Sequence, residues 1–355
     1  MLVAGATGVA GLAAVRHFAS LPGWDVIGCS RRPHGVAGAR HIPLDLTDPD
    51  ACRTALADLE VTHAVYAALY EQADLVAGWR DRAQMETNRR MFANFIDPLS
   101  DHGSLEHVSL LQGAKAYGLH VARVPVPARE GGTRHDHENF YFLQEDHLRD
   151  RSEQRAWSWT VLRPQVIFGE SIGSPMNLVP AIGAYAAICR ETGRPFSFPG
   201  GAPSMLEAVD ADLLARCFEW SAKSPDAWGE IFNVTNGDVF VWEYVWPVIA
   251  DALGVDVGRP SPARLASKLG EWEAPWASIV YKHALRSPRS LAAFVGQSFT
   301  YADVLFGYGR AVTPLPGLLS TVKIRRAGFH DCVDTEDMFR RWFARFQDRK
   351  LLPPR

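Results

Sequence analysis

The stretch Leu2-Val3-Ala4-Gly5-Ala6-Thr7-Gly8-Val9-Ala10-Gly11 decides the fold. Its first three residues predict a short apolar strand, and residues 12–18 continue with helical spacing. A strand, a glycine turn and a helix are the context of a dinucleotide-binding motif. Glycine lets the backbone approach a pyrophosphate closely, and the start of the helix offers free N–H groups to it. We therefore expect the turn to bind a nucleotide through Gly5, Thr7, Gly8, Val9, Ala10 and Gly11.

Strands and helices alternate beyond this turn. Further strands are predicted at residues 25–29, 42–44, 62–69, 106–112 and 159–164, and helices at 49–59, about 80–99 and 138–155. This alternation indicates an α/β fold with a Rossmann-like, doubly wound parallel sheet. After about residue 170 the pattern loosens, with helices at 178–190, 211–221, 242–253 and 335–346, a strand at 231–234 and a loop at 255–265.

The domain organisation follows from this change of pattern. We expect a nucleotide-binding domain over residues 1–170, with returning segments near residues 204–240. Residues 171–355 then form mainly a smaller substrate-binding domain, in which tryptophan and phenylalanine are concentrated.

The overall composition excludes several classes of protein. The 355 residues carry a formal net charge of -3, which gives no electrostatic reason to expect nucleic acid or an anionic membrane as a partner. The five cysteines are scattered and form no zinc-site spacing. We see no signal peptide and no apolar run long enough for a membrane span. We expect a soluble cytoplasmic protein, and a homodimer is compatible with the sequence.

The end of the second predicted strand selects the cofactor. A binder of NAD usually has an acidic residue there, which accepts from the ribose 2′-hydroxyl. This chain has Ser30, Arg31 and Arg32 instead, and two guanidinium groups suit the 2′-phosphate of NADP. Asp45 and Leu46, at the end of the third strand, are expected beside the adenine.

A lysine and a tyrosine are candidates for the chemistry. None of the nine tyrosines is followed by a lysine four residues later, so the usual Tyr-x-x-x-Lys pair of short-chain dehydrogenases is absent from the sequence. Lys115 is the only lysine among the first 222 residues and follows the predicted fifth strand, whose carboxyl end should face the ligand crevice. Tyr141 opens the helix between the fifth and sixth strands.

These segments together resemble the progesterone 5β-reductase/iridoid synthase-like (PRISE) family of atypical extended short-chain dehydrogenases/reductases. The resemblance covers most of the chain. It rests on Gly5–Gly11, Ser30-Arg31-Arg32, Gly113-Ala114-Lys115, Asn139-Phe140-Tyr141 with Glu145-Asp146, Leu162–Gly169, Pro175–Leu178, Tyr185–Cys189 and Phe232–Asp238. The family motif commonly has a second tyrosine where this chain has Phe142, which leaves Tyr141 as the tyrosine of the motif.

The resemblance implies an NADPH-dependent reductase that delivers hydride to the β-carbon of an α,β-unsaturated carbonyl compound, a small apolar enone. It implies that Tyr141 stabilises the enolate oxygen and that Lys115 supports it. It also places four further residues near the cofactor, namely Pro164, Val166, Ser174 and Met176.

Alternatives remain open on the sequence alone. A ketone or aldehyde reductase, or an epimerase, would use the same groups on the same scaffold, and a non-catalytic NADP-sensing protein would need neither Tyr141 nor Lys115. Tyr117 is a second candidate for the catalytic tyrosine, whereas Ser109 and Cys189 are interpreted as structural. His135 and His137 resemble a metal pair without a third ligand, so we predict no metal site.

Overall fold

The computed structural model describes residues 1–132, 134–153 and 155–355, and the chain divides into two compact units. The first unit contains Met1–Val166, Ala211–Thr235 and Leu318–Asp331, and the second contains Ile167–Asp210, Asn236–Gly317 and Cys332–Arg355. The chain therefore passes repeatedly between the units. The sequence analysis placed one returning region near residues 204–240, and it did not foresee the return at Leu318–Asp331.

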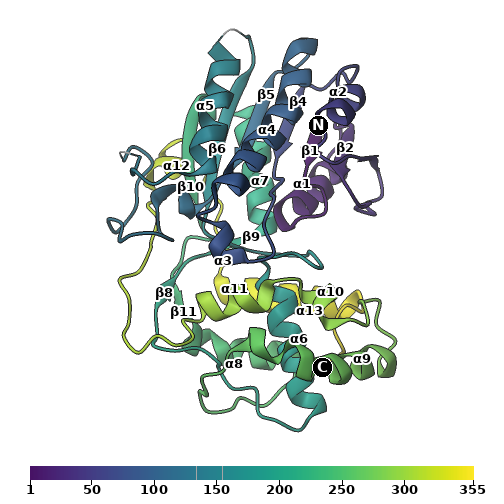
Figure 1. Ribbon diagram of the computed structural model, residues 1–355, viewed down its shortest axis with the longest axis vertical. Coiled ribbons are helices and arrows are strands. Elements are labelled where there is room, and N and C mark those ends of the chain that lie inside the picture. The colour runs from purple at the N-terminus through teal and green to yellow at the C-terminus, as the bar shows by residue number, and fades with distance from the viewer. Residues whose placement is uncertain (133, 154) are drawn as a thin grey trace. The chain divides into compact units, whose positions relative to one another are not determined.

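A seven-stranded parallel sheet, in the order β10-β6-β5-β4-β1-β2-β3, forms the centre of the first unit (Figure 1). This arrangement confirms the predicted α/β class. The strands are β1 (Leu2–Ala4), β2 (Val26–Ser30), β3 (Ala39–Pro43), β4 (His63–Tyr66), β5 (His107–Leu111), β6 (Ser158–Pro164) and β10 (Glu230–Val234).

Helices cover both faces of this sheet. On one face, apolar residues of α2 (Pro49–Leu56), α4 (Arg82–His102) and α5 (Phe140–Glu153) pack in one core with the strands. Figure 1 shows α4 and α5 side by side. The Ser109 side chain points to the opposite face, where its hydroxyl lies 3.1 Å from that of Ser221 in α7 (Ala211–Lys223). Helix α1 (Val9–Ser20) packs against α7. The remaining elements of this unit are α3 (Leu75–Gly78), η1 (Ala114–Tyr117), η2 (Pro225–Ala227) and α12 (Val322–Arg326).

The second unit is mainly helical. Its helices are α6 (Leu178–Glu191), α8 (Trp242–Leu253), η3 (Leu265–Lys268), α9 (Leu269–Lys282), α10 (Leu291–Val295), α11 (Ser298–Leu305) and α13 (Thr335–Asp348). Two short sheets pair β7 (Val166–Phe168) with β9 (Ala208–Asp210), and β8 (Met205–Leu206) with β11 (Phe240–Val241). Aromatic side chains fill its core: Trp246 is fully buried and stacks on Phe196 with ring centroids 4.4 Å apart.

Local sequence signals explain most boundaries of the helices and strands. Some elements begin or end a few residues away from the predicted positions. The predicted strand at 62–69 is confined to His63–Tyr66, because the chain then leaves the sheet in a loop. The helix expected over 80–99 starts after the Asp81 cap and continues through Pro98 to a left-handed Gly103. Helices α9 to α12 were not foreseen. No helix among those described has both the length and the continuous apolar character of a bilayer span.

Candidate active site

The glycine turn lies between β1 and α1, at the carboxyl end of an inner strand of the sheet. Gly5 has a φ of 76°, and a Cβ at this position would lie 2.6 Å from the Ala67 carbonyl oxygen. A Cβ at Gly11 would lie 2.2 Å from the Gly5 carbonyl oxygen. Gly8 is the N-cap of α1 and offers no capping side chain, and the first turn has no acidic residue. The turn is thus a backbone cradle, and the positive end of the helix dipole favours a phosphate there.

The end of β2 carries the predicted selectivity residues. Ser30 ends the strand and its hydroxyl donates to the Arg32 carbonyl oxygen at 2.6 Å, so this corner is rigid, while the Arg31 and Arg32 side chains are exposed. Asp45 follows β3 and accepts from the backbone N–H and the hydroxyl of Thr47. These two hydrogen bonds lower the pKa of Asp45, and Arg31 contributes in the same direction. Leu46 is buried in the core between the sheet and its helices.

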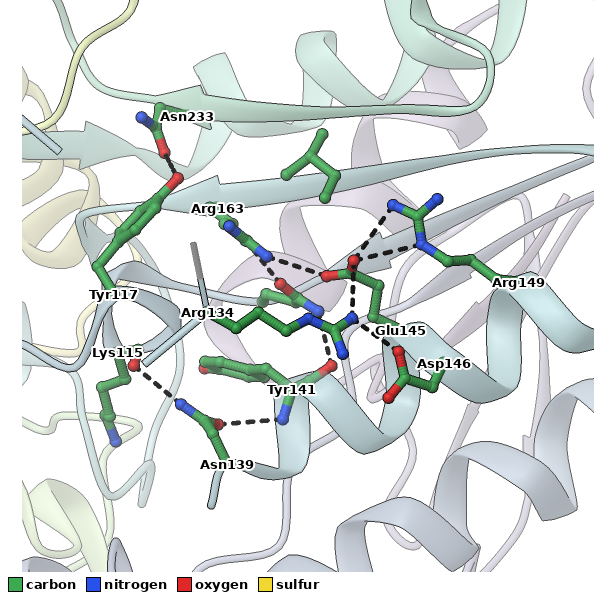
Figure 2. Close-up of polar contacts among 12 residues, drawn as sticks. Lys115, Tyr117, Arg134, Asn139, Tyr141, Glu145, Asp146, Arg149, Arg163 and Asn233 are labelled. Atoms are coloured by element: carbon green, nitrogen blue, oxygen red, sulfur yellow. Dashed lines mark hydrogen bonds and ion pairs between the residues drawn. The ribbon is translucent and has the colours of Figure 1, made fainter. Parts of the chain in front are cut away.

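Tyr141 lies in the first turn of α5, where its backbone is held to two other segments. The Asn139 side chain donates to the Lys115 carbonyl oxygen at 2.8 Å and accepts from the Tyr141 N–H at 3.1 Å. Gln112 donates to the Tyr141 carbonyl oxygen at 2.9 Å. Figure 2 shows how Asn139 links the segments of Lys115 and Tyr141. The structure therefore links the backbone segments that carry the two catalytic candidates, which are 26 positions apart in the sequence.

The hydroxyl of Tyr141 faces the glycine that follows β5. A Cβ built at Gly113 would lie only 3.2 Å from this hydroxyl oxygen. Any side chain at Gly113 would therefore crowd the position from which the tyrosine donates a hydrogen bond. Tyr141 as a whole is 8% exposed, so most of its ring is packed inside the protein.

Lys115 lies in η1, immediately beyond β5. Its ammonium nitrogen is 3.7 Å from Glu71 Oε1 and 3.8 Å from the centre of the Trp79 ring. Burial lowers the pKa of Lys115 to about 8, and the Glu71 carboxylate opposes this shift. Burial raises the pKa of Glu71, while Lys115 acts in the opposite direction. A lysine with a lowered pKa is a feature of functional sites.

A buried ion pair holds the Tyr141 helix against the sheet (Figure 2). Arg163 in β6 donates to Glu145 Oε2 in α5 at 2.9 Å and to Gln112 Oε1 at 2.8 Å. Arg134 and Arg149 also contact the Glu145 carboxylate. Burial alone would raise the pKa of Glu145, but the arginines outweigh it and the pKa is lowered. Neither Glu145 nor Arg163 was predicted to have this role, although the position of Glu145 one helical turn after Tyr141 was an available signal.

Tyr117 has a different position from Tyr141. Its hydroxyl donates to Asn233 Oδ1 in β10 at 2.5 Å, and the Arg163 guanidinium lies 5.1 Å from the centre of its ring. Burial raises the pKa of Tyr117. The hydroxyl is thus engaged with the neighbouring strand, which favours Tyr141 over Tyr117 as the catalytic candidate.

The remaining candidates fall into two groups. Pro164 ends β6 and Val166 starts β7, whereas Ser174 and Met176 lie in the second unit, in the loop before α6. Cys189 is buried in α6, and burial raises its pKa to about 11, as expected of a core thiol. Among the described residues, no group of three or more histidine, cysteine, aspartate or glutamate side chains is arranged to hold a metal ion.

Comparisons with known proteins were made at the level of family, sequence and structure. Residues 51–353 match the PRISE-like Rossmann-fold domain. The chain is 32% identical over 378 aligned positions to (S)-8-oxocitronellyl enol synthase of Antirrhinum majus, covering 99% of this chain and 92% of the relative. It is 29% identical to 3-oxo-Delta(4,5)-steroid 5-beta-reductase of Arabidopsis thaliana, with the same coverage.

Solved structures share the fold at low sequence identity. A UDP-glucose 4-epimerase of Thermotoga maritima, solved with UDP-glucose, superposes with a TM-score of 0.68 at 15% identity and 98% coverage of both chains. The UDP-glucose 4-epimerase of Thermus thermophilus, solved with NAD, gives 0.64 at 18% identity and the same coverage. These likenesses concern the fold alone. The family match, the relatives and the parallel sheet with its glycine turn agree with the resemblance in the sequence, and the chain belongs to the PRISE-like Rossmann-fold family.

Proposed function

We propose that this protein is an NADPH-dependent reductase of α,β-unsaturated carbonyl compounds that reduces the carbon–carbon double bond. The observation that carries the proposal is the junction of β5, η1 and α5, where Asn139 ties the Lys115 segment to the first turn of the Tyr141 helix. One relative is named as an enol synthase, and the other as a reductase of a 3-oxo-Delta(4,5)-steroid, in which a double bond is conjugated with a carbonyl group.

The chain's own residues supply the electrostatics of this reaction. NADPH supplies the hydride when it is bound. As hydride reaches the β-carbon, negative charge develops on the carbonyl oxygen of the substrate, and a preorganised donor at that oxygen lowers the barrier. In this proposal Tyr141, whose ring is mostly buried, donates this hydrogen bond from its hydroxyl group. The Lys115 ammonium adds positive charge to the same region, which lowers the pKa of a neighbouring phenol and strengthens it as a donor.

The cofactor is NADPH rather than NADH in this proposal. Arg31 and Arg32 are exposed immediately after β2, and the hydroxyl of Ser30 holds the backbone of that corner. Guanidinium groups recognise a phosphate through paired, charge-assisted hydrogen bonds. The glycine turn fits the pyrophosphate, because a side chain at Gly5 or Gly11 would fill the cradle.

Two other functions are less well supported. Carbonyl reduction or epimerisation would use the same tyrosine and lysine. The similarity to epimerases is a similarity of fold, at 15–18% sequence identity, and it carries no argument about the reaction. A non-catalytic NADP sensor would need neither Tyr141 nor Lys115. The substrate we propose is a small apolar enone.

The experiment is to incubate the purified protein with NADPH and cyclohexenone, to follow the absorbance of the reduced nicotinamide, and to identify the product by mass spectrometry. We expect the saturated ketone. The allylic alcohol as product would contradict the proposal and favour carbonyl reduction. NADH in a parallel reaction tests the cofactor, and equal turnover with both cofactors would contradict the assignment of NADPH. A panel of linear and cyclic enones, tested in the same way, covers substrates of other shapes.

A further inference from the structure

Glu71 is a buried acid outside the motifs that the sequence analysis singled out. We propose that Glu71 is a positioning residue for Lys115, whose buried carboxylate holds the lysine side chain in place as an ammonium ion at the active site. The inference rests on the role proposed above for Lys115 and names the group that maintains it.

The carboxylate of Glu71 is itself fixed by the protein. It lies in the loop between β4 and α3, and its side chain is 3% exposed. Glu71 Oε2 accepts from Gln84 Nε2 in α4 at 2.6 Å. Gln84 is buried as well, and its Oε1 accepts from the Gln72 N–H at 2.8 Å. The other carboxylate oxygen, Oε1, is the one that faces Lys115.

Trp79, which like Glu71 lies in the connection between β4 and α4, also contacts the Lys115 ammonium. Trp79 is the C-cap residue of α3, and the Lys115 nitrogen lies 3.8 Å from the centre of its ring. The negative face of an indole attracts a cation, and this attraction is strongest where the cation is desolvated. Residues 71–79 therefore place a carboxylate and an aromatic face around one lysine.

Several basic groups also lie near Lys115. His120 follows η1, and His135 and His137 precede α5, with ring centroids of His120 and His137 5.4 Å apart. Arg80 donates to the His120 carbonyl oxygen at 3.1 Å. Burial and the positive charge of Lys115 lower the pKa of His120 to about 4, so this imidazole is neutral at neutral pH. Glu71 thus supplies the negative charge that opposes burial and keeps the lysine protonated.

Removal of the carboxylate charge should make Lys115 lose its proton at a lower pH. In Glu71→Gln the hydrogen bond from Gln84 to the side chain at this position is retained through the amide oxygen, but the ion pair is lost. A buried charge without its partner is strongly unfavourable, and a lysine relieves the penalty by deprotonating. An arginine could not respond in this way, because it does not lose its proton.

The test measures the protonation of Lys115 directly. The folded protein is treated with trace acetic anhydride across a pH series, and mass spectrometry gives the acetylation of each of its six lysines. We expect Glu71→Gln to lower the midpoint of Lys115 acetylation by about one pH unit. The other five lysines are internal references. The matched control is Glu138→Gln, an exposed acid that pairs with Arg82 rather than with Lys115, and its Lys115 midpoint should equal that of the wild type.

An unchanged Lys115 midpoint in folded Glu71→Gln would overturn the proposal. A double-substitution cycle covers the case in which that variant unfolds. Glu71→Gln should lower the melting temperature strongly when Lys115 is present and should not lower it in a Lys115→Met background, because the buried Glu71 carboxylate there has already lost its partner. Equal losses in both backgrounds would also overturn the proposal.

The kinetic readout separates this inference from the proposed function. With an enone that the wild type reduces, Glu71→Gln should move the alkaline limb of the kcat/KM profile to lower pH by the same amount as the acetylation midpoint. If the wild type reduces no enone, the proposed function fails, while the acetylation experiment still decides whether Glu71 controls Lys115.

Discussion

Two tyrosines lie close to Lys115, and their hydroxyl groups face different surroundings. Tyr117 donates to Asn233 in β10, whereas the Tyr141 hydroxyl lies next to the position where Gly113 lacks a side chain. We predict that Tyr141→Phe reduces kcat by about 100-fold or more, because it removes the donor to the developing enolate. The affinity for NADPH, measured by fluorescence titration, should be unchanged.

Tyr117→Phe is the matched control for this prediction. It removes the same hydroxyl group from a neighbouring ring, leaves Asn233 without one hydrogen bond, and should cost about 1 kcal/mol of stability. Its kcat should remain within a few-fold of the wild type. A large loss of turnover in Tyr117→Phe, with Tyr141→Phe fully active, would reverse the assignment of the two tyrosines.

The pKa of Lys115, lowered to about 8 by burial, predicts the pH dependence of the reaction. If the ammonium form is required, kcat/KM is constant below this pH and falls above it. The contribution of Lys115 to the stability of the folded protein changes with pH in the opposite direction to kcat/KM. The unfolded lysine titrates near 10.5, so between about pH 8 and 10.5 the unfolded chain binds more protons, and the contribution of this group to folding rises with pH. A rate that falls above pH 8 without loss of circular dichroism would agree; a rate independent of pH up to 10 would contradict the requirement.

We propose that the two arginines after β2, Arg31 and Arg32, select NADPH over NADH. We predict that Arg31→Ala combined with Arg32→Ala raises the Kd for NADPH by at least about tenfold, because two charge-assisted contacts to the 2′-phosphate are lost. The Kd for NADH should change little. Calorimetric titration with both cofactors measures this, and an equal loss for NADPH and NADH would remove the basis for the 2′-phosphate assignment.

At the scale of elements, the β1–α1 junction depends on backbone contact that leaves no room for side chains. We predict that Gly11→Ala abolishes detectable NADPH binding, since the new Cβ would lie 2.2 Å from the Gly5 carbonyl oxygen and would push the turn open. Gly131→Ala is the control, because a Cβ there meets nothing within 4 Å. Binding is measured by fluorescence titration after both variants are shown to fold. Wild-type affinity in Gly11→Ala would show that the turn does not hold the cofactor.

At the scale of the whole molecule, the first unit is assembled from segments that are far apart in the chain. Strand β10 pairs with β6 at one edge of the sheet, and α7 packs on α1. A fragment of residues 1–166 lacks both elements. We predict that this fragment does not fold stably, because it exposes the β6 edge and the apolar face under α7. Thermal denaturation and size-exclusion chromatography test this, and a soluble fragment with a cooperative transition would contradict it.

The sequence was sufficient for features encoded by local patterns. The glycine turn and the alternation of strands and helices predicted the α/β fold, which the structure confirms, and the separate Lys115 and Tyr141 motifs predicted the family, which the comparisons confirm. The pairing of Glu71 with Lys115 and that of Glu145 with Arg163 were not predictable. Each joins residues on different elements, and the sheet topology alone brings them together. The helices around α9 to α11 were missed because they lie in a stretch where proline and glycine interrupt the periodic pattern.

The central claim is that hydride reaches the carbon β to the carbonyl group. The most direct measurement uses NADPH deuterated at C4 of the nicotinamide, an enone that the protein reduces, and NMR of the product. The account predicts deuterium on the β-carbon of a saturated ketone, with the α-hydrogen derived from solvent. Deuterium on the carbinol carbon of an allylic alcohol would contradict it and would make the protein a carbonyl reductase.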